Sequence, residues 1–378
     1  MIQVEGNIGT SPTDAVLRQA ATHYQAGRLA EAETLYRQLL MLRPGFAPEL
    51  ADVHASLALV LFRQGRTGEA IEAFRHALEA APGNADTLYK LGNMLLREGE
   101  AGPNRIAESF ACFRQHARLT FEASGKGAVA PHRIRHDREQ QDYLAQTYGL
   151  REWKFHLADG ERTQSRTVNA ANVAKATEEW NSSSPRIIVI DNLLSEETLE
   201  KLRRYCWGST IWRETHPEGY LTAMPEHGLA CPLIAQIDED MRAAYPGILG
   251  VHLLRYLWAF KYDSRLSGVG THADPSVVTF NFWITADEAN LDPEHGGLTV
   301  WNVATPSGLK TEQYIGDTAG CQAYLARAGA RSITIPYRSN RAVVFASDLF
   351  HETDRMHFKD GYTNRRINIT MLYGKRGA

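Results

Sequence analysis

The stretch Thr271-His272-Ala273-Asp274, followed at residues 275–285 by PSVVTFNFWIT, decides the fold of the C-terminal half. Residues 277–285 are aromatic and β-branched, which predicts a strand. Short strands joined by turns, without interleaved helices, indicate an antiparallel sandwich or barrel. Further strands of this kind are predicted at residues 252–262, 298–303, 332–337, 341–347 and 366–373.

The motif His272-Ala273-Asp274 has a distant counterpart in His351, 79 positions after the first histidine. Two histidines and one carboxylate are the ligand set of the non-haem Fe(II) facial triad, which leaves coordination positions open. One intervening residue places His272 and Asp274 on the same side of an extended chain, because side chains alternate along a strand. We therefore predict a metal site at His272, Asp274 and His351, with His252, His295 and His357 as non-ligands.

The last predicted strand carries two adjacent arginines that point to opposite faces. Arg366, Asn368 and Thr370 share one face, and Arg365 lies on the other. A guanidinium offers a planar fork to a carboxylate, so we expect the face with Arg366 to line a carboxylate-binding pocket. A register shifted by one residue would exchange the faces, and Arg365 is then the alternative.

With these motifs, residues 185–378 resemble the Fe(II)- and 2-oxoglutarate-dependent dioxygenases of the prolyl-hydroxylase-like superfamily. The resemblance implies a double-stranded β-helix of jelly-roll or cupin type, with iron at His272, Asp274 and His351. It also implies that 2-oxoglutarate chelates the metal through its keto acid end and reaches Arg366 with its far carboxylate. Oxidative decarboxylation with O2 would give succinate and CO2 and oxidise an unactivated C–H bond. The matching segments are an opening strand at residues 187–194, Tyr262, residues 272–274, 296–298, 343–345 with His351, and 366–368. The resemblance implies that Tyr262, Asn368 and Thr370 line the cosubstrate site with Arg366.

The substrate is less constrained than the chemistry. Prolyl hydroxylases use lysine where Arg366 stands, and the aspartyl type lacks the carboxylate that Asp274 supplies, so neither substrate carries over. Residues 302–331 form a long interruption that we expect to act as a lid. The tryptophans at positions 258, 283 and 301 are candidates for the pocket wall, although packing in the core is the commoner role of such residues.

The N-terminal third contains an internal repeat. Gly27, Gly65 and Gly99 punctuate helical segments 38 and 34 residues apart, and residues 24–28 (YQAGR) correspond to residues 62–66 (FRQGR). A period of about 34 residues with small residues and a terminal proline is typical of tetratricopeptide repeats. We therefore predict a helical solenoid at residues 13–120. Such arrays bind peptides or partner helices on their concave face, so we expect a protein partner or self-association.

The sequence thus predicts an α+β multidomain chain: a tetratricopeptide solenoid, a helical and polar linker at residues 121–184, and the oxygenase-like domain at residues 185–378. Within the linker, His132, His136 and Asp137 mimic a metal motif, but the neighbouring arginines oppose a cation, and we predict a structural role.

The leading interpretation of the function is hydroxylation of a peptide or protein side chain, recruited partly through the repeats. The same chemistry on a small metabolite, with the repeats serving dimerisation, is one alternative. An inactive scaffold that senses 2-oxoglutarate or iron is the other.

Composition narrows the class of protein. The chain has 378 residues, enough for two domains, and its net charge of -3 gives no case for nucleic acid as a partner. The start of the sequence has no secretory pattern, and the apolar run at residues 55–62 is too short for a bilayer. Four isolated cysteines predict neither disulfides nor a zinc cluster. We therefore expect a cytoplasmic enzyme without membrane association.

Overall fold

The computed structural model describes residues 12–42, 47–102, 104–121, 130–263, 266–306, 314 and 316–376. The chain divides into two compact units, Met1–Leu119 and Thr120–Ala378. Residues 121–184, which the sequence sets apart as a linker, cluster with the second unit. No helix of the described ranges is long and apolar enough to span a membrane.

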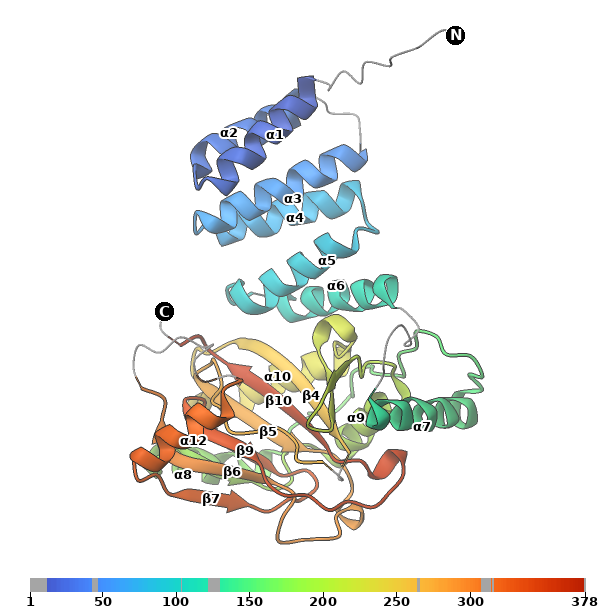
Figure 1. Cartoon of the computed structure of the whole chain (residues 1–378), viewed down its shortest axis with the longest axis vertical. Helices are drawn as coiled ribbons and strands as arrows, with labels where there is room; N and C mark the ends of the chain where they lie inside the picture. Colours follow the sequence, from blue (N-terminus) through green and yellow to red (C-terminus); the bar gives the residue numbers. More distant parts are fainter. Residues whose placement is uncertain are drawn as a thin grey trace. The chain divides into compact units, whose positions relative to one another are not determined.

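Consecutive helix pairs build the first unit and stack in layers (Figure 1). Small, aliphatic and aromatic residues on their facing sides form one continuous core that runs from Ala20 to Cys112. Each pair buries its apolar face only against its neighbours, as in other solenoids. The pairs are α1 (Pro12–Gln25) with α2 (Leu29–Leu42), α3 (Ala47–Arg63) with α4 (Thr67–Ala80), and α5 (Ala85–Asn93), continued by the π-helix η1 (Met94–Glu98), with α6 (Arg105–Thr120).

The repeated glycines have different roles in the first two pairs and in the third. Gly27 and Gly65 end the first helix of their pairs with φ of 75° and 81°, a left-handed conformation that favours glycine. Gly99 has φ of -57°, and a Cβ there would lie 2.7 Å from the carbonyl oxygen of Leu95. The third glycine is therefore needed for close approach after the π-helix and does not make the same turn.

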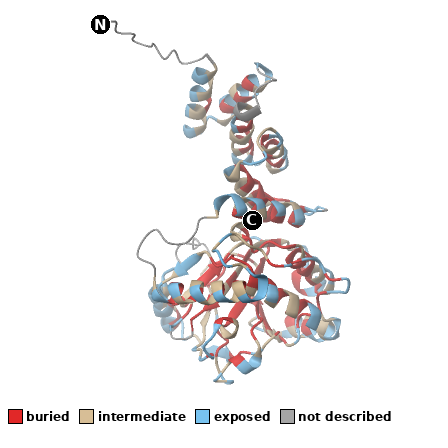
Figure 2. Ribbon diagram, turned by 90° about the vertical axis from the view of Figure 1, so that its right-hand side faces the viewer, coloured by how far each residue is buried: buried red, intermediate tan, exposed pale blue. Residues whose placement is uncertain are grey.

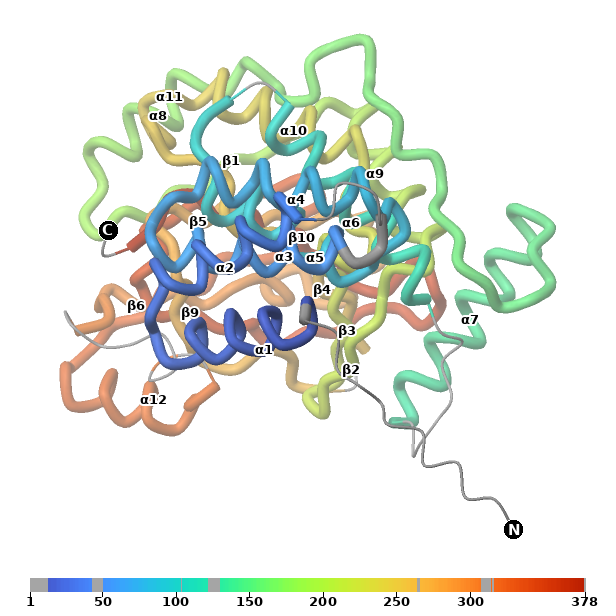
Figure 3. Tube along the Cα trace, turned by 90° about the horizontal axis from the view of Figure 1, so that it is seen from above, coloured from blue at the N-terminus to red at the C-terminus, as the bar shows by residue number. Residues whose placement is uncertain are grey.

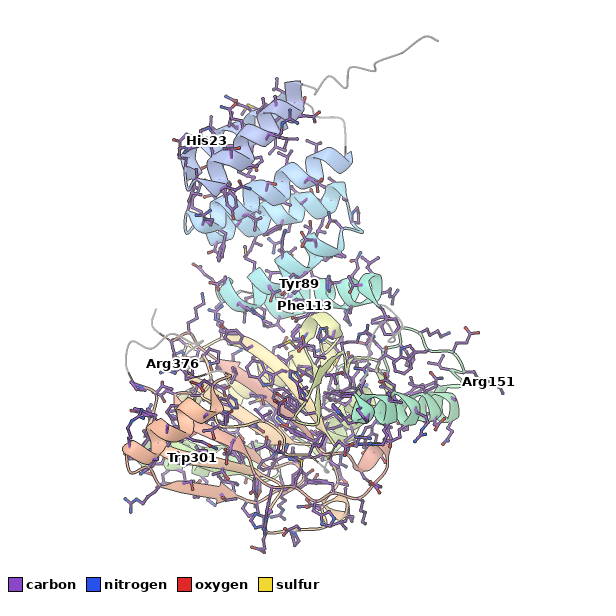
Figure 4. The ribbon with its side chains drawn as sticks, viewed as in Figure 1. His23, Tyr89, Phe113, Arg151, Trp301 and Arg376 are labelled. Atoms are coloured by element: carbon purple, nitrogen blue, oxygen red, sulfur yellow. The ribbon has the colours of Figure 1, made fainter. Side chains whose placement is uncertain are left out.

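The third pair is joined by aromatic packing. Tyr89 of α5 and Phe113 of α6 meet edge to face, with ring centroids 6.5 Å apart (Figure 4). A Cβ at Gly92 would lie 3.0 Å from the Phe113 ring, so the small residue permits the ring to seat against α5. This contact explains why a glycine lies in the middle of a buried helix face.

Substituting Gly65 by alanine tests the turn. We expect Gly65→Ala to lower the free energy of unfolding of the first unit by about 1–2 kcal/mol, the cost of a left-handed conformation for a residue with a Cβ. Gly68→Ala is the matched control, because Gly68 lies in α4 with open space around the added carbon and has no positive φ. Urea unfolding of both variants measures the difference. Equal stability losses would contradict the assigned role of the turn.

The second unit contains two antiparallel sheets that fit a jelly roll. The larger has the strand order β1-β8-β5-β10-β4-β3-β2 and the smaller has the order β7-β6-β9. Neighbours in the list are paired antiparallel throughout. The strands are β1 (Ile187–Ile190), β2 (Glu214–His216), β3 (Tyr220–Ala223), β4 (Leu254–Tyr262), β5 (Val278–Trp283), β6 (Leu298–Ala304), β7 (Ser332–Ile335), β8 (Ala342–Ala346), β9 (Leu349–Thr353) and β10 (Ile367–Tyr373).

The six strands that the sequence predicts between residues 252 and 373 correspond to β4, β5, β6, β7, β8 and β10. Two details of the prediction were wrong. The opening strand ends at Ile190 instead of residue 194, and His351 lies within a strand of its own, β9, which was not predicted. The short hairpin of β2 and β3 was not predicted.

Helices cover the outer face of the larger sheet. Seen from above, α8, α9, α10 and α11 lie on one side of β1, β5, β10 and β4, while β6, β9 and α12 lie on the other (Figure 3). On the helix side, the Tyr373 hydroxyl of β10 meets the Met241 sulfur of α10 at 3.9 Å. Buried residues gather in the strands, and the outward faces of the helices are exposed (Figure 2). The helices are α7 (Pro131–Tyr148), α8 (Val173–Ser182), α9 (Glu196–Gly208), α10 (Pro232–Ala244), α11 (Pro246–Leu249) and α12 (Thr318–Arg327).

Candidate metal centre

The side chains of His272, Asp274 and His351 converge, with their ligand atoms all within 4.8 Å of one another. His272 Nε2 lies 3.9 Å from Asp274 Oδ1, and His351 Nε2 lies 3.5 Å from Asp274 Oδ2. Atoms that each lie about 2.1 Å from one first-row metal ion are about 3–4 Å apart, so small adjustments would close the site. Among the described residues, no other group of three His, Cys, Asp or Glu side chains is placed in this way.

The backbone brings the two histidines together. His272 precedes β5 and His351 lies in β9, and the two residues exchange backbone hydrogen bonds of 3.0 and 2.8 Å. Each imidazole donates its Nδ1–H to a carbonyl oxygen two residues earlier, Gly270 at 2.8 Å and Leu349 at 3.1 Å. These bonds fix the tautomer that leaves the Nε2 lone pair free for a metal ion.

A network of hydroxyl groups orients the carboxylate. Thr279 Oγ1 donates to Asp274 Oδ2 at 2.8 Å and lies 2.9 Å from Ser347 Oγ, while the backbone N–H of Asp274 donates to the Ser347 carbonyl at 2.9 Å. Groups of this kind hold a ligand in its binding rotamer. Sequence reasoning missed Thr279 and Ser347, because no motif spacing distinguishes them from other hydroxyl residues in buried strands.

Burial lowers the pKa of one of the two histidines of the centre. The His351 side chain is 3% exposed, and this desolvation, with a smaller contribution from His272, lowers the pKa of His351 to about 4. Asp274 opposes the shift without reversing it. The imidazole is therefore neutral at pH 7, which is the form that binds metal ions.

A narrow inner cavity adjoins the three ligands. Its lining includes Arg366, Asn368, Thr370 and Tyr262, the residues that the sequence assigns to the cosubstrate, together with His272, Asp274 and His351. Its volume is about 20 Å³, enough for about one water molecule. A five-carbon diacid would therefore have to push the lining side chains apart on binding.

Arg366 is a buried cation in this cavity, 1% exposed. Its Nε and Nη2 donate to the carbonyl oxygens of Gly296 and Gly297 at 2.6 and 3.0 Å, and its guanidinium lies 4.6 Å from the Tyr262 ring centre. No carboxylate of the described residues forms an ion pair with it. A buried charge without a counter-ion is costly, so the site favours an anionic ligand.

Two amide side chains complete the cavity. Asn368 Oδ1 accepts from Arg366 Nη1 at 3.2 Å, and Asn368 Nδ2 lies 3.3 Å from Thr370 Oγ1. Asn281 of β5, paired with Thr370, has a buried side-chain oxygen without a partner among the described residues. This unsatisfied group was not predicted, since Asn281 lies within the aromatic and β-branched run at residues 277–285, whose residues are expected to pack in the core. Together with Arg366 it fits a ligand that carries oxygen atoms.

Arg365 is separated from the cavity by the register of β10. Its side chain pairs with Glu139 of α7 at 2.8 Å and with Asp263 at 3.7 Å. It does not line the inner cavity, whereas Arg366 does. The two arginines therefore offer a matched pair for mutagenesis.

A larger outer cavity of about 690 Å³ opens beside His272 and Asp274. Trp258 lines both cavities, while Trp283 is fully buried and Trp301 packs near α12 (Figure 4). The expected lid contributes Gly316, Thr318 and Gln322 to the outer wall. Residues 307–313 and 315 of that segment lie outside the described ranges.

The remaining predicted non-ligands lie apart from the centre. His295 Nδ1 is 3.0 Å from Asp354, and neither His252 nor His357 lines the inner or the outer cavity. His132 and His136 are buried in α7, where Arg133 pairs with Asp137 at 2.8 Å. This ion pair accounts for the HRIRHD sequence structurally, with no third ligand among the described residues.

Gly297, whose carbonyl oxygen accepts a hydrogen bond from Arg366, lies in close contact with the backbone of β7. An added Cβ at Gly297 would lie 1.9 Å from the carbonyl oxygen of Ile335 on β7. We expect Gly297→Ala to lower the free energy of unfolding by at least about 3 kcal/mol, the upper range for overpacking, because backbone must move. Thermal unfolding of the purified variant measures the loss. A variant as stable as the wild type would show that the β6–β7 contact tolerates displacement.

Comparison with known protein families identifies the repeats of the first unit. The family model described as tetratricopeptide repeat matches residues 17–85 and 55–102, and the first unit therefore carries tetratricopeptide repeats, as predicted. The "Protein CTR9 homolog" of Arabidopsis thaliana is 28% identical over 113 residues, which are 28% of this chain and 10% of that protein. The chain thus spans a tenth of the length of this relative.

Solved structures resemble parts of this chain at low similarity. The epimerase SnoN, crystallised with Fe3+, alpha ketoglutarate and nogalamycin RO, is 12% identical, with a TM-score of 0.41 over 55% of this chain and 85% of its own. The Yersinia enterocolitica secretion chaperone SycD is 15% identical, with a TM-score of 0.26 over 31% of this chain and 83% of its own. At these TM-scores neither similarity identifies a fold or an activity.

Proposed function

We propose that the second unit is an Fe(II)- and 2-oxoglutarate-dependent oxygenase with a double-stranded β-helix fold, which hydroxylates a peptide or protein side chain. The proposal rests above all on one juxtaposition: a His-Asp-His set shares a buried cavity with Arg366, a cation that lacks a counter-ion among the described residues. A metal triad alone fits many ions, and a buried arginine alone fits many anions. Together they fit a metal-bound acid with a second carboxylate.

The residues present fit the roles that this chemistry needs. Iron with 2-oxoglutarate and O2 supplies oxidation of a C–H bond, and the keto acid is consumed to succinate and CO2. His272, Asp274 and His351 would hold the ion, and a set of two histidines and one carboxylate leaves coordination positions open for the cosubstrate and O2. Arg366 binds and orients the far carboxylate, and the narrow inner cavity excludes bulk water. The outer cavity brings a substrate next to His272 and Asp274.

The tetratricopeptide repeats support a macromolecular substrate. Such solenoids bind extended peptides or helices, which raises the local concentration of an attached target. In this proposal the first unit recruits the substrate or a second copy of the chain. Deleting residues 1–119 is then expected to raise KM for a protein substrate and to leave cosubstrate affinity unchanged.

Anaerobic titration of the metal-free protein with Fe(II) and 2-oxoglutarate tests the chemistry without knowledge of the substrate. A visible metal-to-ligand charge-transfer band is expected for the full chain and should be lost in His351→Ala. Circular dichroism confirms that both proteins are folded. A folded wild type without a band would overturn the proposal and favour a scaffold.

A further inference from the structure

The two cavities beside the metal centre carry opposite charges. The inner one holds Arg366, whereas the described lining of the outer one includes Glu214, Glu218 and Glu352 and neither lysine nor arginine. The carboxylate of Asp274 also lines the outer cavity, but its charge would be offset by the metal ion of the proposed function. A substrate that enters therefore meets three further carboxylates.

Two of these carboxylates belong to the hairpin of β2 and β3, at the rim. Glu214 lies 3.9 Å from His216 and 3.8 Å from His227, and Glu218, in the turn, forms no ion pair with a described residue. The Tyr220 ring stacks on His216 of the same hairpin, with ring centroids 4.3 Å apart. After burial and Tyr262, the charges of Glu218 and Glu214 raise the pKa of Tyr220. The rim is therefore a negative surface around an aromatic ring.

The third carboxylate lies deeper, next to a proposed metal ligand. Glu352 follows His351 in β9, is half-buried, and accepts a 2.5 Å hydrogen bond from Thr271 Oγ1. Gln322 of α12 lies 3.4 Å from the same hydroxyl. Glu352 is thus held in the wall by one neutral donor, the Thr271 hydroxyl, and forms no ion pair with a cation of the described residues.

Aromatic side chains connect the rim to the metal centre. Trp258 and Phe260 are two residues apart on β4 and so share a face, with ring centroids 6.4 Å apart. Tyr220 of β3 meets Phe260 edge to face at 5.2 Å. Aromatic faces attract ammonium and guanidinium groups and pack against their aliphatic stems.

Given the proposed function, we infer that the outer cavity selects a substrate with a protonated amine or guanidinium group, either the lysine or arginine side chain of a peptide or a free cationic amine. Its aliphatic stem lies along Tyr220, Trp258 and Phe260, and its charge meets the carboxylates. This places carbon atoms of the stem beside the metal centre. An acidic substrate would meet uncompensated negative charge instead. The volume of about 690 Å³ is in the range of small-ligand sites.

Binding to the full chain loaded with Fe(II) and 2-oxoglutarate, without oxygen, tests this inference. The probes are peptides identical except for a central lysine, arginine, norleucine or glutamate, together with free lysine and arginine. Isothermal titration is expected to show at least 10-fold tighter binding of the lysine or arginine peptide than of the norleucine peptide. The preference should shrink as salt rises. Free lysine or arginine binding as tightly as its peptide would identify the amine itself as the ligand.

Variants of the cavity lining test whether the preference for a cationic peptide arises in the outer cavity. Glu218→Gln and Glu352→Gln should each weaken binding of the cationic peptide about 10-fold and leave that of the norleucine peptide unchanged. Glu294→Gln, an exposed position outside the cavity lining, should alter neither. Because peptides can also bind the repeats, a preference that survives both cavity variants would overturn the inference.

The outcomes separate the two proposals. A charge-transfer band with equal or tighter binding of norleucine or glutamate peptides would refute the cationic substrate and leave the oxygenase assignment in place. Absence of the band from folded protein would refute the oxygenase assignment itself. When binding shows the preference, mass spectrometry under air should detect a gain of one oxygen on the preferred peptide, matched by succinate.

Discussion

Asp274→Asn is expected to lower Fe(II) affinity by at least 100-fold and to abolish 2-oxoglutarate turnover. The substitution keeps the shape of the side chain and removes its charge, so the ion loses its one anionic protein ligand. Asp274 is 2% exposed, and water cannot easily take the place of its carboxylate. Anaerobic Fe(II) titration followed by an assay for succinate measures both effects.

Two further variants make this result specific. Thr279→Val removes the 2.8 Å hydrogen bond to Asp274 together with the 2.9 Å contact with the Ser347 hydroxyl. It should lower metal affinity by about 10–100-fold, as for other groups that orient a ligand. In the wild type the Asp292 carboxylate lies 3.5 Å from exposed Arg355, away from the proposed ligands. The control variant Asp292→Asn should therefore bind iron as the wild type does. Wild-type iron affinity in Asp274→Asn would show that the metal, if any, binds elsewhere.

Arg366→Met is expected to raise the Kd for 2-oxoglutarate by about 100-fold, because hydrogen bonds to a charged group contribute about 1.5–3 kcal/mol. Methionine approximates the length of the side chain and can still pack against Tyr262, so loss of the charge is the main change. Iron affinity should be unchanged. The charge-transfer band, titrated with cosubstrate at saturating Fe(II), reports the difference directly.

Arg365→Met is the matched control from the neighbouring position. It removes the ion pairs with Glu139 and Asp263 and should lower stability without changing cosubstrate affinity. Arg366→Lys should fall between the wild type and Arg366→Met, since lysine offers a point charge instead of a fork. If Arg365→Met lost cosubstrate affinity and Arg366→Met retained it, the assignment of the carboxylate to Arg366 would be wrong.

Patterns local to the chain were enough to predict much of this architecture. Alternating and β-branched runs located six strands, and the period of the glycines located the repeats. The strand β9 was missed because LFHET follows β8 after only two residues and ends in polar side chains. The different role of Gly99 was also invisible, since it depends on a π-helical turn that no simple spacing encodes.

What the sequence could not supply were contacts between distant segments. Arg366 is held by the carbonyl oxygens of Gly296 and Gly297, about 70 positions earlier, and carbonyl groups have no side-chain signature. Asn281 resembles any other residue of a buried strand until its unsatisfied oxygen is seen to face the cavity. The charge of the outer cavity likewise emerges only when a hairpin and β9 are brought to the same wall.

The backbone bridge between His272 and His351 joins the segment leading into β5 of the larger sheet to β9 of the smaller one. An ion held by both residues would cross-link the two layers, and because it would bind the folded chain and not the unfolded one, it would stabilise the fold only when bound. Binding of the metal ion and stable packing of the two sheets would then be a single cooperative event. By linkage, free metal at 100 times its Kd adds about 2.7 kcal/mol to the stability of the fold. The amount of folded protein would then depend on metal supply, because the fraction that survives proteolysis would rise and fall with the iron available.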